Sequence, residues 1–199
     1  TIRKNSYAAC ALAVLLLTGA LCGCAESGQG GVAGEEGSGS SASQAESQSP
    51  GADEAQETTV VFEGQDIEGN AVTSDIFGQS KLTMVNVWAT YCNPCLQEMP
   101  ELGELAAEYD AEEFQIIGIV SDVIEGTDQT QAESLVQQTG ANYPHLLLNE
   151  SIYYALLTDM SGVPTTFFID ENGVVLGRVI GAKEKSVWEE IINGLLAEE

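Results

Sequence analysis

Positive charge is scarce in this sequence. Its 199 residues include six lysines and arginines against 31 aspartates and glutamates, which gives a formal net charge of −25. Such a chain repels the phosphates of nucleic acids, so the composition excludes a basic nucleic-acid-binding face. The sequence also has a single histidine, His145, which excludes a metal site built from several histidines. We therefore expect neither a nucleic acid nor a metal ion as a partner.

The apolar run near the N-terminus is short for a membrane span. Residues 7–21 form a run of 15 residues, whereas a spanning helix needs about 20. Arg3 and Lys4 precede it, an arrangement typical of a signal peptide. A plain secretory signal and an uncleaved anchor helix stay open as alternatives. All of these place the rest of the chain outside the cytoplasm.

The end of this run resembles the lipobox of bacterial lipoproteins. It reads Leu21-Cys22-Gly23-Cys24, with leucine three residues before Cys24 and a small residue directly before it. Cys22 does not fit, because Gly19 stands where the leucine is needed. The resemblance implies that residues 1–23 are removed and that Cys24 is lipidated, which anchors the protein to the membrane.

Bulky apolar side chains are nearly missing from the next segment. Residues 25–57 contain seven glycines and seven serines, and Val32 is their one sizeable apolar side chain. Such a segment buries too little apolar surface to offset the loss of chain entropy on folding. We expect residues 24–57 to be the lipidated cysteine and a disordered tether, and residues 58–199 to be one folded domain.

The folded part has few cysteines. Cys92 and Cys95 are its only two, and they are separated by two residues. Closing so small a loop restrains the unfolded chain little, so the pair is a poor structural staple. The pair is better explained by chemistry.

Hydrophobic periodicity predicts an α/β fold with a central mixed sheet and helices on both faces. Expected strands lie at 59–62, 71–73, 82–88, 114–120, 145–148, 165–169 and 174–180, and expected helices at 93–109, 129–139, 152–157 and 183–197. The first two strands form an N-terminal hairpin. The strands at 165–169 and 174–180 form another, because Asn172-Gly173 supplies the positive φ angles of a tight turn.

The two cysteines lie where a buried strand meets a helix. A thiol at a helix N-terminus faces unpaired N–H groups and the positive end of the helix dipole, which stabilise a thiolate. We therefore expect Cys92 to be the nucleophile and Cys95, one turn inside the helix, to be the resolving thiol. Half of a zinc site is the competing interpretation, but the other ligands of such a site are missing.

Three segments together resemble the TlpA/ResA-like thiol-disulfide oxidoreductases of the thioredoxin superfamily. They are Trp88 to Cys95, Glu98-Met99-Pro100 and Gly162 to Asp170, and the resemblance spans residues 58–199. It implies a thioredoxin-like fold with an added N-terminal hairpin and an insertion between Val120 and Asn149. It also implies that Pro164 is a cis-proline beside the disulfide. Substrate contacts are implied for Trp88, Tyr91, Asn93, Pro94 and Val163, the last through its backbone.

The sequence departs from many thioredoxins six residues before Cys92. Asn86 stands there in place of an aspartate, and an amide cannot take the proton of the resolving thiol. The family supplies a carboxylate at the position of Glu98, three residues after Cys95 and on the same helix face. A partly buried Glu98 would tune the thiol pKa values and accept that proton. Alternatively, Glu98 belongs to a solvated stripe with Glu101, Glu104 and Glu108.

Taken together, these features predict a membrane-anchored, extracytoplasmic thiol-disulfide oxidoreductase. The resemblance implies exported disulfide-containing protein substrates, for example an apocytochrome c, and a membrane thiol-transfer protein as electron donor. We expect a monomer with no cofactor other than the Cys92–Cys95 disulfide.

Three other functions stay open. One is a disulfide-forming oxidase that uses the same pair. Another is a peroxidase of the peroxiredoxin group, although the peroxidatic motif is not visible. The third is a copper-binding module of the SCO type, which would use His145, a residue more simply read as a surface residue at a strand start.

Overall fold

The computed structural model describes residues 59–197. The predicted signal peptide, Cys24 and the tether lie outside the described residues, and so do residues 198–199. Within 59–197, no helix combines the length and the apolarity that a membrane span requires.

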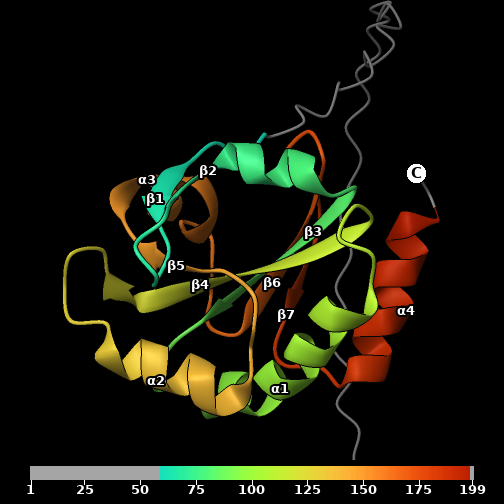
Figure 1. The fold of residues 1–199 in the computed structure, drawn as a ribbon. Helices are drawn as coiled ribbons and strands as arrows, with labels where there is room; N and C mark the ends of the chain where they lie inside the picture. Colours follow the sequence, from blue (N-terminus) through green and yellow to red (C-terminus); the bar gives the residue numbers. More distant parts are fainter. Residues whose placement is uncertain (1–58, 198–199) are drawn as a thin grey trace, which may run out of the picture. The chain divides into compact units, whose positions relative to one another are not determined.

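A five-stranded mixed sheet forms the centre of the domain (Figure 1). The strand order is β5-β4-β3-β6-β7, in which β3, β4 and β5 are parallel while β6 runs antiparallel to both β3 and β7. The strands are β3 (Leu82–Trp88), β4 (Phe114–Ile124), β5 (His145–Leu148), β6 (Thr165–Asp170) and β7 (Val175–Ile180). The central strand β3 is buried along its whole length, as its nearly continuous apolar sequence predicts.

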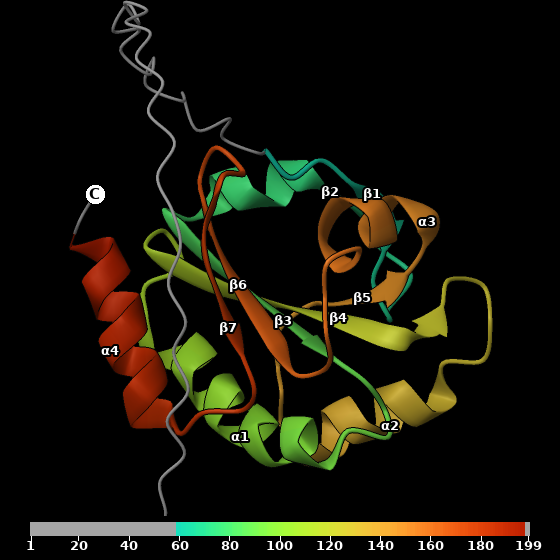
Figure 2. The ribbon, with the colours of Figure 1, turned by 180° about the vertical axis from the view of Figure 1, so that it is seen from behind.

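Helical segments cover both faces of the sheet (Figures 1 and 2). On one face lie α1 (Asn93–Glu108), α2 (Thr130–Thr139) and α4 (Lys185–Leu196). On the other lie η1 (Ser74–Gln79), α3 (Glu150–Ile152) and the π-helical turn η2 (Tyr153–Leu157). The mixed α/β architecture predicted from the periodicity is confirmed.

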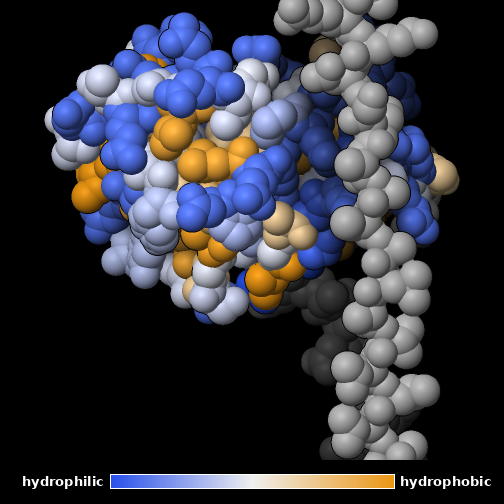
Figure 3. Space-filling view, turned by 90° about the horizontal axis from the view of Figure 1, so that it is seen from below, coloured by the Kyte–Doolittle hydropathy of each residue, from blue (hydrophilic) through white to orange (hydrophobic). Residues whose placement is uncertain are grey.

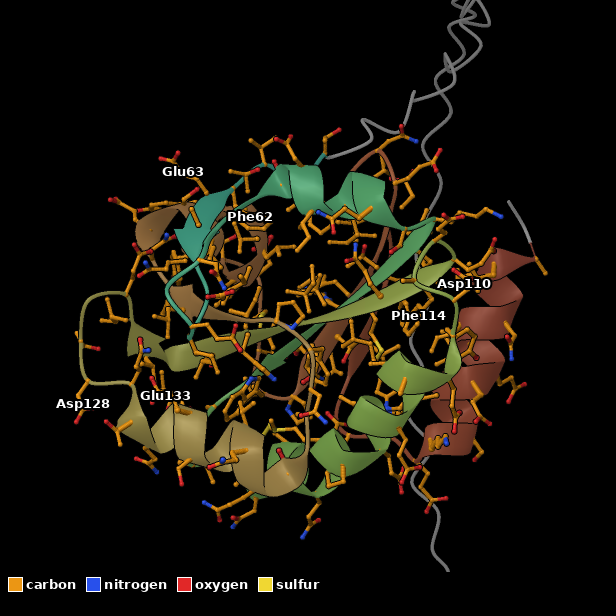
Figure 4. The ribbon with its side chains drawn as sticks, viewed as in Figure 1. Phe62, Glu63, Asp110, Phe114, Asp128 and Glu133 are labelled. Atoms are coloured by element: carbon orange, nitrogen blue, oxygen red, sulfur yellow. A yellow bond between two sulfur atoms is a disulfide. The ribbon has the colours of Figure 1, made fainter. Side chains whose placement is uncertain are left out.

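The core consists of two layers because successive side chains of a strand point to opposite faces. On β3, Met84 and Trp88 pack under α1 and α4, whereas Val85 and Val87 pack under η1 and η2. Figure 4 shows Phe62 and Phe114 pointing into the interior, while Glu63, Asp110, Asp128 and Glu133 lie at the periphery. The side chain of Asn86 points to the same face of the sheet as those of Met84 and Trp88, so a fully buried amide lies among apolar side chains beneath the helices.

The N-terminal hairpin differs from its prediction. Its strands are β1 (Glu63–Gln65) and β2 (Ala71–Thr73), so the predicted first strand at 59–62 is wrong. Thr59 and Val60 instead run beside the β6–β7 loop, where Val60 N–H donates to the carbonyl of Gly173 at 2.8 Å, while the carbonyl of Phe62 accepts from the N–H of Ser74 at 3.0 Å. This pairing is long-range, and the local pattern did not reveal it.

The other boundaries differ from prediction by small shifts. Strand β4 continues to Ile124, four residues beyond the expected end, and the helix expected at 152–157 begins at Glu150, where the side chain of Asn149 caps it. The β6–β7 turn has the expected glycine conformation, with φ of +81° at Gly173. Helix α4 begins at Lys185 rather than at Lys183.

Candidate active site

Cys92 and Cys95 are joined in a disulfide at the start of α1. Cys92 is the N-cap residue, and its Sγ accepts a hydrogen bond from the backbone N–H of Cys95 at 3.3 Å. Pro94 occupies the first turn, where its missing N–H costs no helical hydrogen bond. Cys95 is fully buried, whereas Cys92 keeps 6% of its surface exposed. The cysteine expected to be the nucleophile is therefore the more accessible of the two.

The loop between β3 and α1 is held by the end of β4. Asp122 accepts hydrogen bonds from the backbone N–H and the hydroxyl of Thr90, at distances of 2.6 to 3.1 Å. The hydroxyl of Ser121 donates to the carbonyl of Trp88 at 2.9 Å. Sequence reasoning did not identify Asp122, although its place just beyond the buried strand next to β3 was a usable signal.

Trp88 lies beneath the site and not on its surface. It is fully buried, and its indole N–H donates to Nδ1 of His145 at 3.1 Å. A side chain without accessible surface offers nothing for a substrate to touch, so we do not retain Trp88 as a substrate contact. Tyr91, Asn93 and Pro94 are exposed around the cysteines, as a contact role requires.

The expectation that His145 is a surface residue is wrong. His145 does begin β5, but only 1% of its surface is exposed, and its ring lies against Gly118 of β4. A Cβ atom at position 118 would come within 2.1 Å of Nδ1, so the close approach of the ring requires glycine there. Burial lowers the pKa of His145 to about 4.

Both ring nitrogens of His145 are occupied. Nδ1 accepts from Trp88, so Nε2 carries the proton and donates to the carbonyl of Ala141 at 3.0 Å. Neither nitrogen has a free lone pair for a metal ion. Within residues 59–197, moreover, no three histidine, cysteine, aspartate or glutamate side chains are grouped as metal ligands. The geometry thus gives the copper-binding alternative no support.

Glu98 is buried and does not belong to the solvated stripe. It is 4% exposed, and its Oε1 accepts from Nδ2 of Asn86 while Oε2 accepts from the backbone N–H of Lys183, both at 3.1 Å. Burial raises the pKa of the Glu98 carboxyl, and the hydrogen bonds from Asn86 and Lys183 only partly counteract that rise. The result is a carboxyl group that binds a proton more readily than an exposed glutamate does.

The other three glutamates of the stripe contact α4. Glu101 accepts from the backbone N–H of Lys185, and Glu104 and Glu108 accept from its ammonium group. These contacts involve a helix start and one lysine, with no contact to either cysteine. The sequence pattern had grouped these four glutamates together. In the fold, Glu98 is a buried acid, whereas the other three contact α4.

A small cavity of about 230 Å³ opens beside the start of α1. It is lined by Pro94, Gln97 and Glu101 of the helix and by Ala182, Lys183 and Glu184 of the β7–α4 loop, and Glu98 reaches it. The buried carboxyl of Glu98 thus has a short route to solvent.

The peptide bond between Val163 and Pro164 is cis. Pro164 is buried, whereas Val163 is half-buried and packs against the cluster that contains both cysteines. Two residues later, Thr166 Oγ1 accepts from Nδ2 of Asn86 at 3.1 Å, so one amide links Glu98 to the strand that follows the cis-proline.

Figure 3 shows the side of the molecule where α1 and α2 lie in Figure 1, with small apolar patches between hydrophilic ones.

Residues 54–178 match the AhpC/TSA family. Thiol:disulfide interchange protein DsbE of Escherichia coli K12 is 31% identical over 134 residues, which cover 67% of this chain and 68% of that protein. Thiol-disulfide oxidoreductase ResA of Bacillus anthracis is 30% identical over 125 residues, 62% of this chain and 68% of ResA.

The fold is also similar to that of a solved structure. A crystal structure of a thiol:disulfide interchange protein of the thioredoxin family from Chlorobium tepidum TLS superposes with a TM-score of 0.62 at 25% identity, covering 72% of this chain and 99% of that one. With its disulfide at a helix start and a cis-proline directly before β6, this chain belongs to the AhpC/TSA family and, within the thioredoxin superfamily, to the TlpA/ResA-like thiol-disulfide oxidoreductases.

Proposed function

We propose that this protein is a lipid-anchored extracytoplasmic enzyme that reduces disulfides of exported proteins. The observation that carries the proposal is the Cys92–Cys95 disulfide at the N-terminus of α1, with the buried acid Glu98 one turn further along the helix. The dithiol form of this pair is the reductant. An accessible nucleophile, a buried resolving thiol and a proton acceptor together supply what disulfide exchange needs.

In the proposed reaction the thiolate of Cys92 attacks one sulfur of the client disulfide. A mixed disulfide forms between Cys92 and the client, and the second client sulfur leaves as a thiolate that takes up a proton. Cys95 then attacks the Cys92 sulfur, and the first client sulfur leaves. The client gains two electrons and two protons, and the enzyme becomes the Cys92–Cys95 disulfide.

Glu98 is proposed to take the proton of Cys95 in the resolving step. Cys95 is fully buried, so water cannot accept its proton directly. The raised pKa of Glu98 brings its proton affinity closer to that of a thiol, which favours transfer. The cavity between α1 and the β7–α4 loop then lets the proton reach solvent.

Client binding is proposed to use the exposed rim of the pair and the cis-proline segment. Tyr91, Asn93 and Pro94 surround Cys92, and the backbone of Val163 pairs with the client chain, as the family resemblance implies. A membrane thiol-transfer protein would reduce the Cys92–Cys95 disulfide again, and an apocytochrome c is one candidate client. We propose lipidation of Cys24 and a monomeric state on the sequence alone.

Substitution of the cysteines tests the proposed chemistry. We expect Cys92→Ala to abolish reduction of insulin, and Cys95→Ala to accumulate a mixed disulfide with the client, because the resolving thiol is gone. Ser186→Ala, an exposed substitution on α4, is the matched control and should leave turnover unchanged. Turnover by Cys92→Ala would contradict the assignment.

A redox titration of the Cys92–Cys95 couple tests the proposed direction. A reductant should have a potential near that of thioredoxin, about −270 mV, whereas about −120 mV is typical of a dithiol that forms disulfides. A potential near the value typical of a disulfide-forming dithiol would favour the oxidase instead. Consumption of peroxide at a rate comparable with disulfide reduction would favour the peroxidase.

A further inference from the structure

The buried amide of Asn86 has partners at one end only. Its Nδ2 lies 3.1 Å from Oε1 of Glu98 and 3.1 Å from Oγ1 of Thr166. Its Oδ1 is one of the buried side-chain atoms of residues 59–197 that have no hydrogen-bond partner. Buried polar atoms are normally paired, so an unpartnered oxygen in the centre of the sheet needs an explanation.

The backbone around this amide is fixed. Asn86 lies in the middle of β3, where it is paired with Gly118 of β4 on one side and with Thr166 of β6 on the other. The side chains of Asn86, Glu98 and Thr166 are all at least 96% buried. Motion is therefore restricted to the side chains, and for Asn86 the simplest motion is rotation of its terminal amide.

The hydrogen bonds that Glu98 can form with the amide depend on the protonation state of Glu98. An ionised carboxylate only accepts hydrogen bonds, whereas a protonated carboxyl group also has one O–H to donate. An asparagine amide has donors on its nitrogen and acceptor sites on its oxygen, and a half-turn of the amide exchanges the two. The hydroxyl of Thr166 can donate or accept, so it fits either orientation.

We propose that Asn86 is a positioning residue whose amide turns with the protonation of Glu98. When Glu98 is ionised, Nδ2 donates to Glu98 and to Thr166, as in this structure. When Glu98 holds a proton, the amide is turned, and Oδ1 accepts from the Glu98 O–H and from the Thr166 hydroxyl. The inference rests on the proposed role of Glu98 as proton acceptor.

The unpartnered Oδ1 atom makes this turn possible. Because Oδ1 has no other partner, the half-turn breaks no third hydrogen bond, and the two contacts to Glu98 and Thr166 are remade with donor and acceptor exchanged. A carboxylate at position 86 would instead repel ionised Glu98. The amide thus lets Glu98 take and release a proton while it keeps a hydrogen bond on the β3 side.

The other groups around Glu98 do not adapt in this way. The backbone N–H of Lys183, in the β7–α4 loop, donates in either state, and the Lys183 ammonium group favours ionised Glu98. On α4 the indole N–H of Trp188 can only donate, and the phenol of buried Tyr143, before β5, stays un-ionised because burial raises its pKa. Cys95 lies one turn away on α1. Of the two groups that donate hydrogen bonds to the Glu98 carboxyl oxygens, the Asn86 amide and the Lys183 backbone N–H, Asn86 is the one whose donor and acceptor can exchange.

A pH titration followed by NMR tests the proposal on the natural chain. The carboxyl ¹³C shift of Glu98 reports its protonation, and the side-chain ¹⁵N and ¹H shifts of Asn86 report the partners of the amide. We expect both sets of signals to move with one midpoint, and we expect Glu98→Gln to abolish the movement at Asn86. Asn86 signals that stay constant while Glu98 titrates would overturn the proposal and leave the role of Glu98 intact.

A kinetic test uses Asn86→Val, which removes both hydrogen-bonding ends at similar volume. The resolving step, measured as release of the client from the mixed disulfide, should slow about ten-fold, as expected for loss of one hydrogen bond to a charged group, and its pH profile should change. The control is Thr83→Val on the same strand, which removes the hydrogen bond from Gln115 to buried Thr83 at 2.9 Å and should leave that profile unchanged.

The two tests fail in different ways. An unchanged pH profile in Asn86→Val would overturn the inference about the amide. An unchanged resolving rate in Glu98→Gln would overturn the proposed function of Glu98 and, with it, the inference. If Asn86→Val does not fold, the NMR titration of the natural chain still decides the question.

Discussion

At the scale of single residues, Glu98 shows how burial and hydrogen bonding compete. Both carboxyl oxygens accept a hydrogen bond, and each such bond favours the ionised form. Burial acts in the opposite direction and is the larger effect, so the pKa of Glu98 is raised above its ordinary value of 4.5. An acid with a raised pKa in the native state binds a proton more tightly than it does in the unfolded chain, and this difference links stability to pH.

We expect Glu98→Gln to stabilise the protein at neutral pH, because burial disfavours the ionised carboxylate and a neutral amide carries no such charge. Wild-type stability should fall as the pH rises from about 4.5, the ordinary pKa, through the raised pKa of native Glu98. Urea unfolding at several pH values measures the difference between the two proteins, which should vanish below pH 4. Equal stability at pH 7 would show that burial does not destabilise ionised Glu98.

His145 changes stability in the opposite pH direction. Its pKa is lowered from 6.5 to about 4 in the native state, so the unfolded chain takes up a proton first as the pH falls. Between pH 6.5 and pH 4 this should cost about 3 kcal/mol of stability, at 1.36 kcal/mol per pKa unit. His145→Gln should lose much less stability over that window in the same urea experiment. If His145→Gln loses as much stability over that window as the wild type, the loss comes from another group.

Local sequence identified the residues of the site better than their surroundings. The cysteine pair, Glu98 and the cis-proline were predictable because each belongs to a short motif. The burial of His145 was not, because it depends on Gly118 of β4 and on Trp88 of β3, which no local pattern places beside it. Asn86 was identified as a departure from other thioredoxins, yet its unpartnered oxygen became visible only with β6 and α1 in place.

At the scale of secondary-structure elements, α1 caps another helix. The N-cap residue of α4, Glu184, makes no side-chain capping hydrogen bond. Glu101 of α1 takes over this function, because its carboxylate accepts from the backbone N–H of Lys185 at the start of α4. A negative charge at that position also interacts favourably with the helix dipole. The helix that carries the cysteines is thus coupled directly to α4.

We expect Glu101→Ala to destabilise the protein by about 1 kcal/mol, as loss of a helix cap typically does. Glu101→Gln should cost less, because the amide oxygen still accepts the hydrogen bond. Thermal or urea unfolding measures both variants. Glu104→Gln is the control: Glu104 forms an exposed pair with Lys185, and exposed pairs contribute about 0 to 1 kcal/mol. Glu101→Ala and Glu104→Gln of equal stability would refute the capping role.

Elements with strong local patterns were predicted well, and those fixed by distant contacts were not. The pattern of β3 gave both of its ends correctly. Helix α4 begins two residues later than predicted because the backbone of Glu184 is extended, which makes Glu184 the N-cap residue. Residues 59–62 had the alternation of a hairpin strand, but Thr59 and Val60 pair beside Gly173, more than a hundred residues away in sequence.

At the scale of the whole molecule, the negative charge remains largely uncompensated. The basic residues between 59 and 197 are Lys81, Arg178, Lys183 and Lys185, in a chain with a formal net charge of −25. Lys81 pairs with Glu113, and Lys185 pairs with Glu104 and Glu108. Such a molecule attracts cations over a distance that depends on salt, about 10 Å at 0.1 M ionic strength.

The domain should therefore discriminate among client disulfides by charge. We expect kcat/KM for a lysine-rich peptide disulfide to exceed that for a glutamate-rich peptide of the same length by about ten-fold at low salt, because electrostatic steering raises the rate of encounter. The ratio should approach one near 1 M salt, where the screening length is about 3 Å. A neutral disulfide such as bis(2-hydroxyethyl) disulfide is the control and should react at a rate independent of salt. Equal rates for the two peptides at low salt would mean that the field of the molecule does not act at Cys92, and the choice of client would then depend on the exposed rim formed by Tyr91, Asn93 and Pro94.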